Sequence, residues 1–272
     1  MRKSSRTSEE RLQRQGQAGL GSIANLIVIG ASAGGYRALI EILKDFSADM
    51  PAAIVILLHR PSGSDMNLKV SLGRFSRLPF LEVEDEAPLQ QACIFVLPPG
   101  RSARFARGTL TVEPGVPDRP VSTINRLFES AAKRYSERVI GVILSGLLKD
   151  GTEGLRAVHE AGGLTIVQDP REAEYPDMPS HAMEKLPVTF CLKLADIGPA
   201  LELLVRRTAR FETGLQVAVR TLRDRAALLV RLTGQSWRNP GTLGFLENEL
   251  ASLRCDIQSI DDLLNASAPG GR

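Results

Sequence analysis

An uninterrupted aliphatic run that ends in a loop of small residues constrains this chain most. Residues 26–29 read Leu-Ile-Val-Ile, and residues 30–35 continue as Gly-Ala-Ser-Ala-Gly-Gly. A run without polar alternation is typical of a strand that is covered on both faces. The next segment, residues 36–43, has its apolar residues at helical spacing. The loop is therefore predicted to join a buried strand to a helix.

The composition of this loop fits three kinds of structure. Its glycines permit tight or left-handed backbone conformations, and the free N–H groups at a helix start attract negative charge. Residues 30–34 also fit the G-x-S-x-G nucleophile elbow, in which Ser32 is the nucleophile and the N–H after it helps to bind an oxyanion. A phosphate or dinucleotide loop and a simple tight turn fit the same letters. The loop alone does not choose between them.

Further apolar runs of strand length recur along the chain. They cover residues 52–59, 93–97, 139–144 and 164–167, with a short run at 188–190 and a helical pattern at 152–159. Alternation of this kind predicts an α/β fold, with a doubly wound, mostly parallel sheet and helices on both faces. Residues 103–113, where Gly108 separates two short alternating segments, predict a small β-hairpin insertion.

The two ends of the chain differ from the central region. Residues 1–24 carry many Arg, Ser and Gln and are expected to form a flexible tail. Over residues 206–272, leucine and isoleucine recur at helical spacing on both sides of Asn239-Pro240-Gly241, which predicts a helical C-terminal extension with one apolar face. That face is expected to pack on the domain or on a second copy, with docking of a regulator or receptor as the alternative.

Charge and composition exclude several classes of protein. A net charge of +3 on 272 residues is too small to predict nucleic-acid binding. No run approaches the roughly eighteen apolar residues of a membrane span, and the basic N-terminus lacks the apolar core of a signal peptide. Cys93, Cys191 and Cys255 lie far apart, so we interpret them as small buried residues of a cytoplasmic protein. Metal-ligand spacings are missing, and we expect no metal or organic cofactor.

The predicted topology brings three polar residues to one edge of the sheet. Ser32 follows the first strand, His59 ends the second, and Asp150 follows the strand at residues 139–144. Ligands bind beyond the carboxyl ends of parallel strands. In a catalytic triad the imidazole would take the serine proton and the carboxylate would orient the imidazole. A structural histidine and a turn or helix-capping aspartate remain open as alternatives for His59 and Asp150.

The end of the second strand argues against a dinucleotide site. A Rossmann site places Asp or Glu there to bind the ribose, whereas this chain has His59. A nucleotide-binding protein is therefore the less favoured hypothesis.

Four blocks, at residues 28–35, 57–61, 141–151 and 168–179, occur in order within about residues 25–205. Together they resemble the CheB-type protein-glutamate methylesterases of bacterial chemotaxis. The resemblance implies a methylesterase domain over 25–205 that removes methyl esters from glutamyl side chains on the cytoplasmic helices of chemoreceptors, with deamidation of receptor glutamines as a related activity. It implies Ser32 as nucleophile, His59 as base and Asp150 as the histidine partner, with the N–H groups of Ala33 and Leu147 in the oxyanion hole.

The chain departs from the family pattern at several points. Members usually carry a phosphorylatable receiver domain before the esterase, whereas a short tail precedes Leu26, so we expect constitutive activity or control by a separate regulatory protein. Arg60 stands where the family has Met, Asn125 where an Asp is common, and Leu147-Leu148 where Met-Gly is usual. These positions are expected to border the cleft and to alter the substrate.

The sequence thus predicts a serine esterase that forms an acyl-enzyme through Ser32. A catalytically silent CheB-like binding or signalling module is the alternative. The missing receiver domain and the altered cleft residues favour that alternative, and the intact Ser32, His59 and Asp150 argue against it.

Overall fold

The computed structural model describes residues 23–60, 67–106, 108–114 and 123–206, together with isolated positions between 223 and 258. The chain divides into two compact units, Met1–Arg206 and Arg207–Arg272. All strands and helices named below belong to the first unit. In the second unit the described positions, such as Arg223 and Leu250, are helical. The rest of the predicted helical extension, and the predicted tail up to residue 22, lie outside the described residues.

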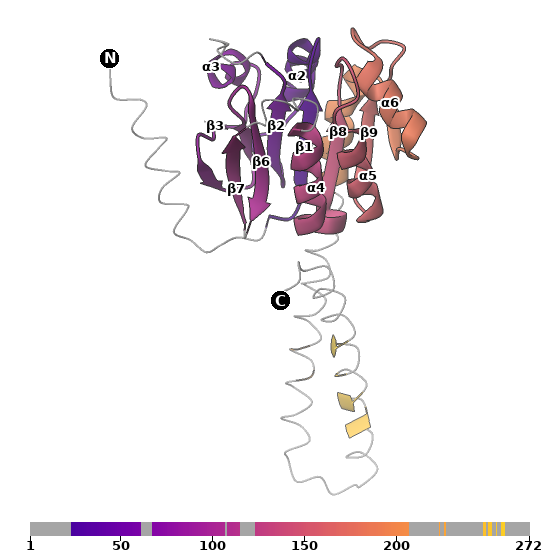
Figure 1. The fold of residues 1–272 in the computed structure, drawn as a ribbon. Coiled ribbons are helices and arrows are strands. Elements are labelled where there is room, and N and C mark those ends of the chain that lie inside the picture. The colour runs from indigo at the N-terminus through magenta and orange to yellow at the C-terminus, as the bar shows by residue number, and fades with distance from the viewer. Residues whose placement is uncertain are drawn as a thin grey trace, which may run out of the picture. The chain divides into compact units, whose positions relative to one another are not determined.

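A seven-stranded parallel sheet forms the centre of the first unit (Figure 1). Its strands are β1 (Leu26–Ala31), β2 (Ala53–Leu58), β3 (Phe80–Glu82), β5 (Cys93–Val96), β8 (Val139–Ile143), β9 (Leu164–Gln168) and β10 (Phe190–Leu192). They follow the order β10-β9-β8-β1-β2-β5-β3, so the chain winds outward from β1 in both directions. The doubly wound α/β sheet predicted from the apolar runs is confirmed, because every residue of β1, β2 and β8 is buried.

Helices cover both faces of this sheet (Figure 1). One face carries α2 (Gly35–Leu43), α3 (Leu68–Gly73) and the helical residues 194–206, and the other carries α4 (Thr123–Tyr135), α5 (Thr152–Glu160) and α6 (Asp177–Lys185). A short 3-10 helix, η2 (Ser136–Arg138), leads from α4 into β8. Successive side chains of β1 alternate between the two resulting cores, with Ile27 and Ile29 in one and Leu26 and Val28 in the other.

A second, antiparallel sheet contains β4 (Glu86–Pro88), β6 (Arg101–Ala106) and β7 (Thr109–Pro114), in the order β4-β7-β6. β6 and β7 form the hairpin predicted over residues 103–113, and Gly108 adopts a φ of 82° at its turn. The sequence pattern does not predict β3 or β4, and it places β10 two residues too early. Each of these strands has three residues, which is too short for a hydrophobic period to register.

The cysteines differ from one another in exposure. Cys93 is buried on β5, as expected, and burial raises the pKa of its thiol to about 12. Cys191 on β10 is exposed, so the expectation that it is a buried residue is wrong. The strand β10 lies at the edge of the sheet, which leaves its side chains less covered than those of the central strands. Cys255 lies outside the described residues.

Asp169 joins the end of β9 to the edge strand β10. Its N–H donates to the carbonyl of Leu192 at 2.7 Å. Its carboxylate, 7% exposed, accepts a hydrogen bond from an Arg171 guanidinium nitrogen at 2.6 Å. This hydrogen bond lowers the pKa of Asp169 from 3.8 to about 2. The ionised carboxylate therefore stabilises the turn that follows β9.

Leu148, in the loop after β8, adopts a left-handed backbone conformation with a φ of 68°. Residues with a Cβ atom rarely adopt this conformation, because the side chain crowds the neighbouring carbonyl. The side chain of Leu148 is 63% exposed, so burial offsets little of the cost. The backbone is held by a hydrogen bond from the Leu148 N–H to Asp177 Oδ2 at 3.3 Å.

We expect Asp169→Asn to lower the free energy of unfolding by an amount that depends on pH. The folded-state pKa lies below the ordinary value of 3.8, so the carboxylate contribution is fully present above that value and is lost as the pH falls to about 2. Urea unfolding of both proteins across this pH range measures the difference. A difference that already shrinks well above pH 3.8 would contradict the assigned pKa.

We expect Leu148→Gly to be more stable than Leu148→Ala by about 1 kcal/mol, because glycine takes the left-handed conformation without a Cβ clash. Thermal unfolding of the two variants, which both remove the exposed side chain, isolates the backbone effect. An alanine variant as stable as the glycine variant would show that this loop is not left-handed in solution.

Candidate active site

Ser32 and His59 come from neighbouring strands at the same level of the sheet. β1 and β2 pair in parallel up to Ala31 and Leu58, and the His59 N–H donates to the Ala31 carbonyl at 2.9 Å. Ser32 and His59 are therefore the next residue on each strand, at its carboxyl end. The direction of winding reverses at β1, which is where ligands bind in open parallel sheets.

Asp150 reaches the same edge through the loop that follows β8. Its Oδ2 lies 3.1 Å from His59 Nε2, and its side chain is 2% exposed. Its two oxygens also accept the backbone N–H groups of Ile124 at 3.0 Å, Asn125 at 3.1 Å and Gly151 at 2.9 Å. The N–H groups at the start of α4 suit a negative charge and hold the carboxylate in place. Asp150 thus presents a buried carboxylate to the imidazole of His59.

Thr123, the first residue of α4, is a further partner of His59 that the sequence reading does not single out. Its Oγ1 lies 2.7 Å from His59 Nε2 and 3.4 Å from Asp150 Oδ2. The side chain is buried. A hydroxyl residue at the start of an amphipathic helix is the signal that the sequence offers, but such a residue ordinarily suggests a helix cap.

The loop that carries Ser32 is a tight turn anchored to the loop after β8. The Ser32 N–H donates to the Ser145 carbonyl at 3.1 Å, and the Ser145 hydroxyl donates to the Ala33 carbonyl at 2.9 Å. Gly34 caps α2 with a φ of 74°, and a Cβ there would lie 2.6 Å from Ser145 Oγ. The residue of this loop with a left-handed backbone is therefore Gly34, whereas Ser32 has a negative φ. Ser32 itself lacks the strain that the elbow pattern suggests.

The loop after β8 approaches Ser32 closely because residue 146 is glycine. A Cβ on Gly146 would lie 2.9 Å from Ser32 Cβ and 2.1 Å from Met178 Sδ. The Gly146 N–H donates to the Tyr175 carbonyl at 2.9 Å, and its carbonyl accepts the Met178 N–H at 3.0 Å. This backbone pairing fixes the loop between the Ser32 turn and the segment before α6.

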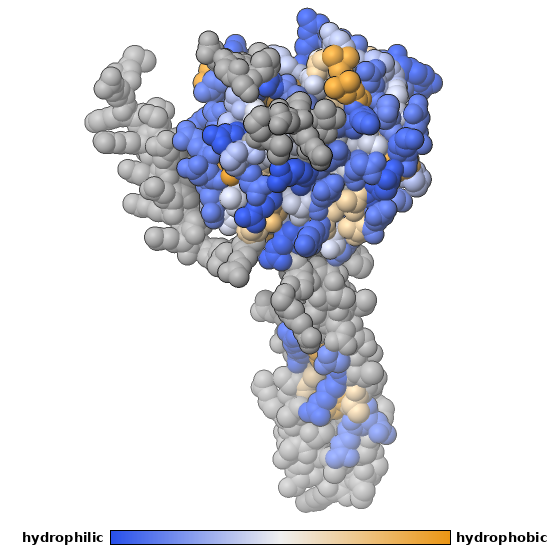
Figure 2. Space-filling model, viewed as in Figure 1, coloured by the Kyte–Doolittle hydropathy of each residue, from blue (hydrophilic) through white to orange (hydrophobic). Residues whose placement is uncertain are grey.

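The N–H groups of Ala33 and Leu147, predicted for the oxyanion hole, lie in the two loops that meet at Ser32. Neither N–H has a hydrogen-bond acceptor among the residues that the structure describes. Leu147 is 48% exposed next to the exposed Leu148. Figure 2 shows a largely hydrophilic face with a small hydrophobic patch above β8. The loop therefore presents apolar side chains and unpaired N–H groups beside the serine.

The structure brings part of the predicted triad into contact. His59 and Asp150 are in hydrogen-bonding distance, whereas no hydrogen bond joins the Ser32 hydroxyl to His59 in the described part of the chain. Asn125, expected to border the cleft, accepts the Gly154 N–H at 2.8 Å with its side-chain oxygen. This side-chain contact binds α4 to α5, while the backbone N–H of Asn125 donates to Asp150 Oδ1 at 3.1 Å in the site itself.

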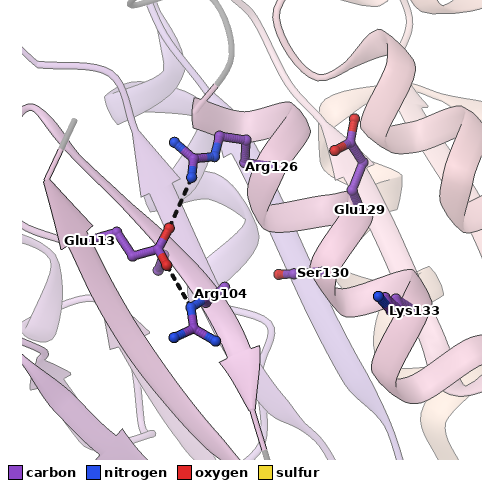
Figure 3. Close-up of a pocket in the computed structure, with 7 residues that line it drawn as sticks. Arg104, Glu113, Arg126, Glu129, Ser130 and Lys133 are labelled. Carbon is purple, nitrogen blue, oxygen red and sulfur yellow. Dashed lines mark hydrogen bonds and ion pairs between the residues drawn. The ribbon is translucent and has the colours of Figure 1, made fainter. Parts of the chain in front are cut away.

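A separate depression with a volume of about 290 Å³, lined mostly by charged residues, lies between the β6-β7 hairpin and α4 (Figure 3). Glu113 lies between Arg104 and Arg126 and forms an ion pair with each. Its carboxylate thus offsets charge from both guanidinium groups. None of the three predicted catalytic residues lines this depression, so it is distinct from the serine site.

The described residues also bear on two other kinds of site. They contain no group of three or more His, Cys, Asp or Glu side chains placed to hold a metal ion. No helix within these residues is long and apolar enough to cross a bilayer.

The comparisons with known proteins agree on one family. Residues 27–201 match the family model described as CheB methylesterase. The protein-glutamate methylesterase/protein-glutamine glutaminase 2 of Anaeromyxobacter dehalogenans is 35% identical over 182 residues, which are 66% of this chain and 53% of that protein. A relative from Leptospira interrogans is 35% identical over 184 residues, which are 66% of this chain and 93% of that protein.

A solved structure shows the same similarity. The crystal structure of the Thermotoga maritima CheB methylesterase catalytic domain matches with a TM-score of 0.60 and 28% identity, over 66% of this chain and 98% of that domain. This chain spans about half the length of the Anaeromyxobacter relative. The family model covers well over half of the chain, and the strand order and the solved domain agree with it, so this chain belongs to the CheB methylesterase family.

Proposed function

We propose that this protein is a protein-glutamate methylesterase that hydrolyses glutamyl methyl esters through an acyl-enzyme on Ser32. The contact of 3.1 Å between His59 Nε2 and the buried Asp150 carboxylate, next to Ser32 on the adjacent strand, carries the proposal. A serine hydroxyl needs a base to react near neutral pH, and an imidazole oriented by a carboxylate is such a base. The relatives are named protein-glutamate methylesterase/protein-glutamine glutaminase, which supports ester and amide substrates.

In the first half of the reaction Ser32 Oγ attacks the ester carbonyl while His59 accepts the hydroxyl proton. Since Nε2 is directed to Asp150 and Thr123, the base is Nδ1. The tetrahedral intermediate collapses, the bond to the methoxy group breaks, and the imidazolium gives its proton to the departing methanol. Hydrogen bonds to catalytic serines are often long before substrate binds. The mechanism is therefore compatible with a structure in which the Ser32–His59 hydrogen bond is not formed.

In the second half a water molecule attacks the acyl-enzyme. His59 takes a proton from this water and returns it to Ser32 Oγ as the free glutamate leaves. The N–H groups of Ala33 and Leu147 would bind the oxyanion in both halves, and both lack a described acceptor that would compete for them. A glutamine side chain would follow the same route with ammonia as the leaving group.

The substrate that we propose is a methylated glutamyl side chain on the cytoplasmic helices of a chemoreceptor. The exposed Leu147 and Leu148 at the site would contact the apolar side chains of such a helix. Localisation in the cytoplasm and control by a separate regulatory protein belong to the same proposal, and each stays a prediction. The catalytically silent module is the competing hypothesis, because the Ser32–His59 hydrogen bond is not formed in the described residues.

We expect Ser32→Ala to lower methanol release from methylated receptor membranes by several orders of magnitude, because the acyl-enzyme can no longer form. Ser71→Ala on α3 is the matched control, since its buried hydroxyl has no hydrogen-bond partner in the described part of the chain. A fluorophosphonate probe should label the wild type and the control but not Ser32→Ala. A folded Ser32→Ala protein with near-normal hydrolysis would exclude this mechanism.

We expect Asp150→Asn to lower kcat by roughly ten-thousand-fold, because the asparagine amide would donate to Nε2 and move the imidazole proton onto Nδ1. Steady-state methanol release at several substrate concentrations separates kcat from KM. Thermal unfolding is measured in parallel, since Asp150 also accepts N–H groups at the start of α4. A folded variant whose kcat stays within about tenfold of wild type would remove Asp150 from the mechanism.

A further inference from the structure

His59 Nε2 has two oxygen partners within hydrogen-bonding distance. Thr123 Oγ1 lies at 2.7 Å and Asp150 Oδ2 at 3.1 Å, and these two oxygens are themselves 3.4 Å apart. The shorter of the two contacts to the imidazole is therefore made by the threonine. Both oxygens belong to buried side chains, with Thr123 7% exposed and Asp150 2% exposed.

The chemistry of His59 Nε2, Thr123 Oγ1 and Asp150 Oδ2 decides which of these atoms donates and which accepts. An ionised Asp150 only accepts, so a contact of 3.1 Å to Nε2 is favourable only when Nε2 carries a hydrogen. Thr123 Oγ1 then accepts from the same N–H, and its own hydroxyl hydrogen is free to donate to Asp150 Oδ2. The reverse arrangement, in which Thr123 donates to an unprotonated Nε2, would leave two acceptors facing each other at His59 and Asp150.

The position of Thr123 is set by the same structure that holds the carboxylate. Thr123 begins α4, and the N–H of the next residue, Ile124, donates to Asp150 Oδ2 at 3.0 Å. A β-branched side chain at a helix start has few rotamers, so its hydroxyl is held in a narrow range of directions. The start of α4 therefore positions both oxygens that meet Nε2.

We propose that Thr123 is a positioning residue for the catalytic base, which acts by holding the hydrogen of His59 on Nε2 and so keeping Nδ1 free to accept the proton of Ser32. This inference rests on the proposed function for the role of His59. It adds a residue whose hydroxyl links the Asp150 carboxylate to the imidazole by hydrogen bonds. In this arrangement Asp150 acts on His59 both directly and through the threonine hydroxyl.

Two substitutions of Thr123 separate the effect of its hydroxyl from the effect of its side-chain shape. Thr123→Val keeps the branched shape and removes the hydroxyl, whereas Thr123→Ser keeps the hydroxyl. We expect the valine variant to lose up to roughly a hundredfold in kcat with little change in KM, because the base is less well aligned. The serine variant should stay close to the wild type in kcat. Circular dichroism and thermal unfolding establish that each variant is folded.

Nitrogen NMR of the His59 imidazole in the resting protein gives a second readout that needs no substrate. Wild type and Thr123→Ser should show a protonated Nε2 and an unprotonated Nδ1, assigned by comparison with His59→Gln. Thr123→Val should show a mixture of tautomers. If the valine variant does not fold, Thr123→Ala, which removes the hydroxyl with less steric demand in the buried site, is measured in its place.

The outcomes distinguish this inference from the proposed function. A hydroxyl-free variant with the kcat and tautomer of the wild type would overturn the role of Thr123, and so would equal losses in the valine and serine variants. A wild-type protein that releases no methanol would overturn the proposed methylesterase. In that case the imidazole NMR still decides whether Thr123 sets the tautomer.

Discussion

The buried carboxylate of Asp150 is the group on which the geometry of this site depends. A carboxylate that is 2% exposed requires donors, and the N–H groups at the start of α4 and of Gly151 supply three of them. The same carboxylate also faces His59 Nε2 and the Thr123 hydroxyl. One interaction thereby sets the position of helix α4, the path of the loop after β8 and the orientation of the imidazole, because a displaced helix would leave the carboxylate buried without partners.

The site also requires the backbone of the Ser32 turn to lie close to the backbone of the loop after β8. Gly34 and Gly146 allow the Ser32 turn and the loop after β8 to approach within a distance that a Cβ atom would block. The Ser145 hydroxyl donates to the Ala33 carbonyl and accepts the Tyr175 N–H at 2.9 Å, so it ties three segments together. In the loop after β8, Leu148 has a left-handed backbone at an exposed position, where the hydrogen bond from its N–H to Asp177 Oδ2 holds it.

Much of the fold could be predicted from the sequence, because buried parallel strands appear as continuous apolar runs. The central strands β1, β2, β5, β8 and β9 and the β6-β7 hairpin lie where such patterns predict them. The strands β3 and β4 were not predicted and β10 was placed two residues too early, since three residues carry no usable period and their pairing depends on neighbours far along the chain. Cys191 is exposed because β10 is an edge strand, and the amino-acid sequence does not show which strand lies at the edge.

The sequence by itself determined the family, through four blocks of matching residues, and the residues that could act as nucleophile, base and histidine partner, because strand ends in a parallel sheet converge on one edge. Only the tertiary structure decided that His59 meets Asp150 through Nε2, that Thr123 joins them, and that the Asn125 side chain binds α5. The reason is geometric: Thr123 lies 64 residues from His59 in the chain, and a hydroxyl at a helix start becomes a partner of the imidazole only when α4 is packed against the sheet.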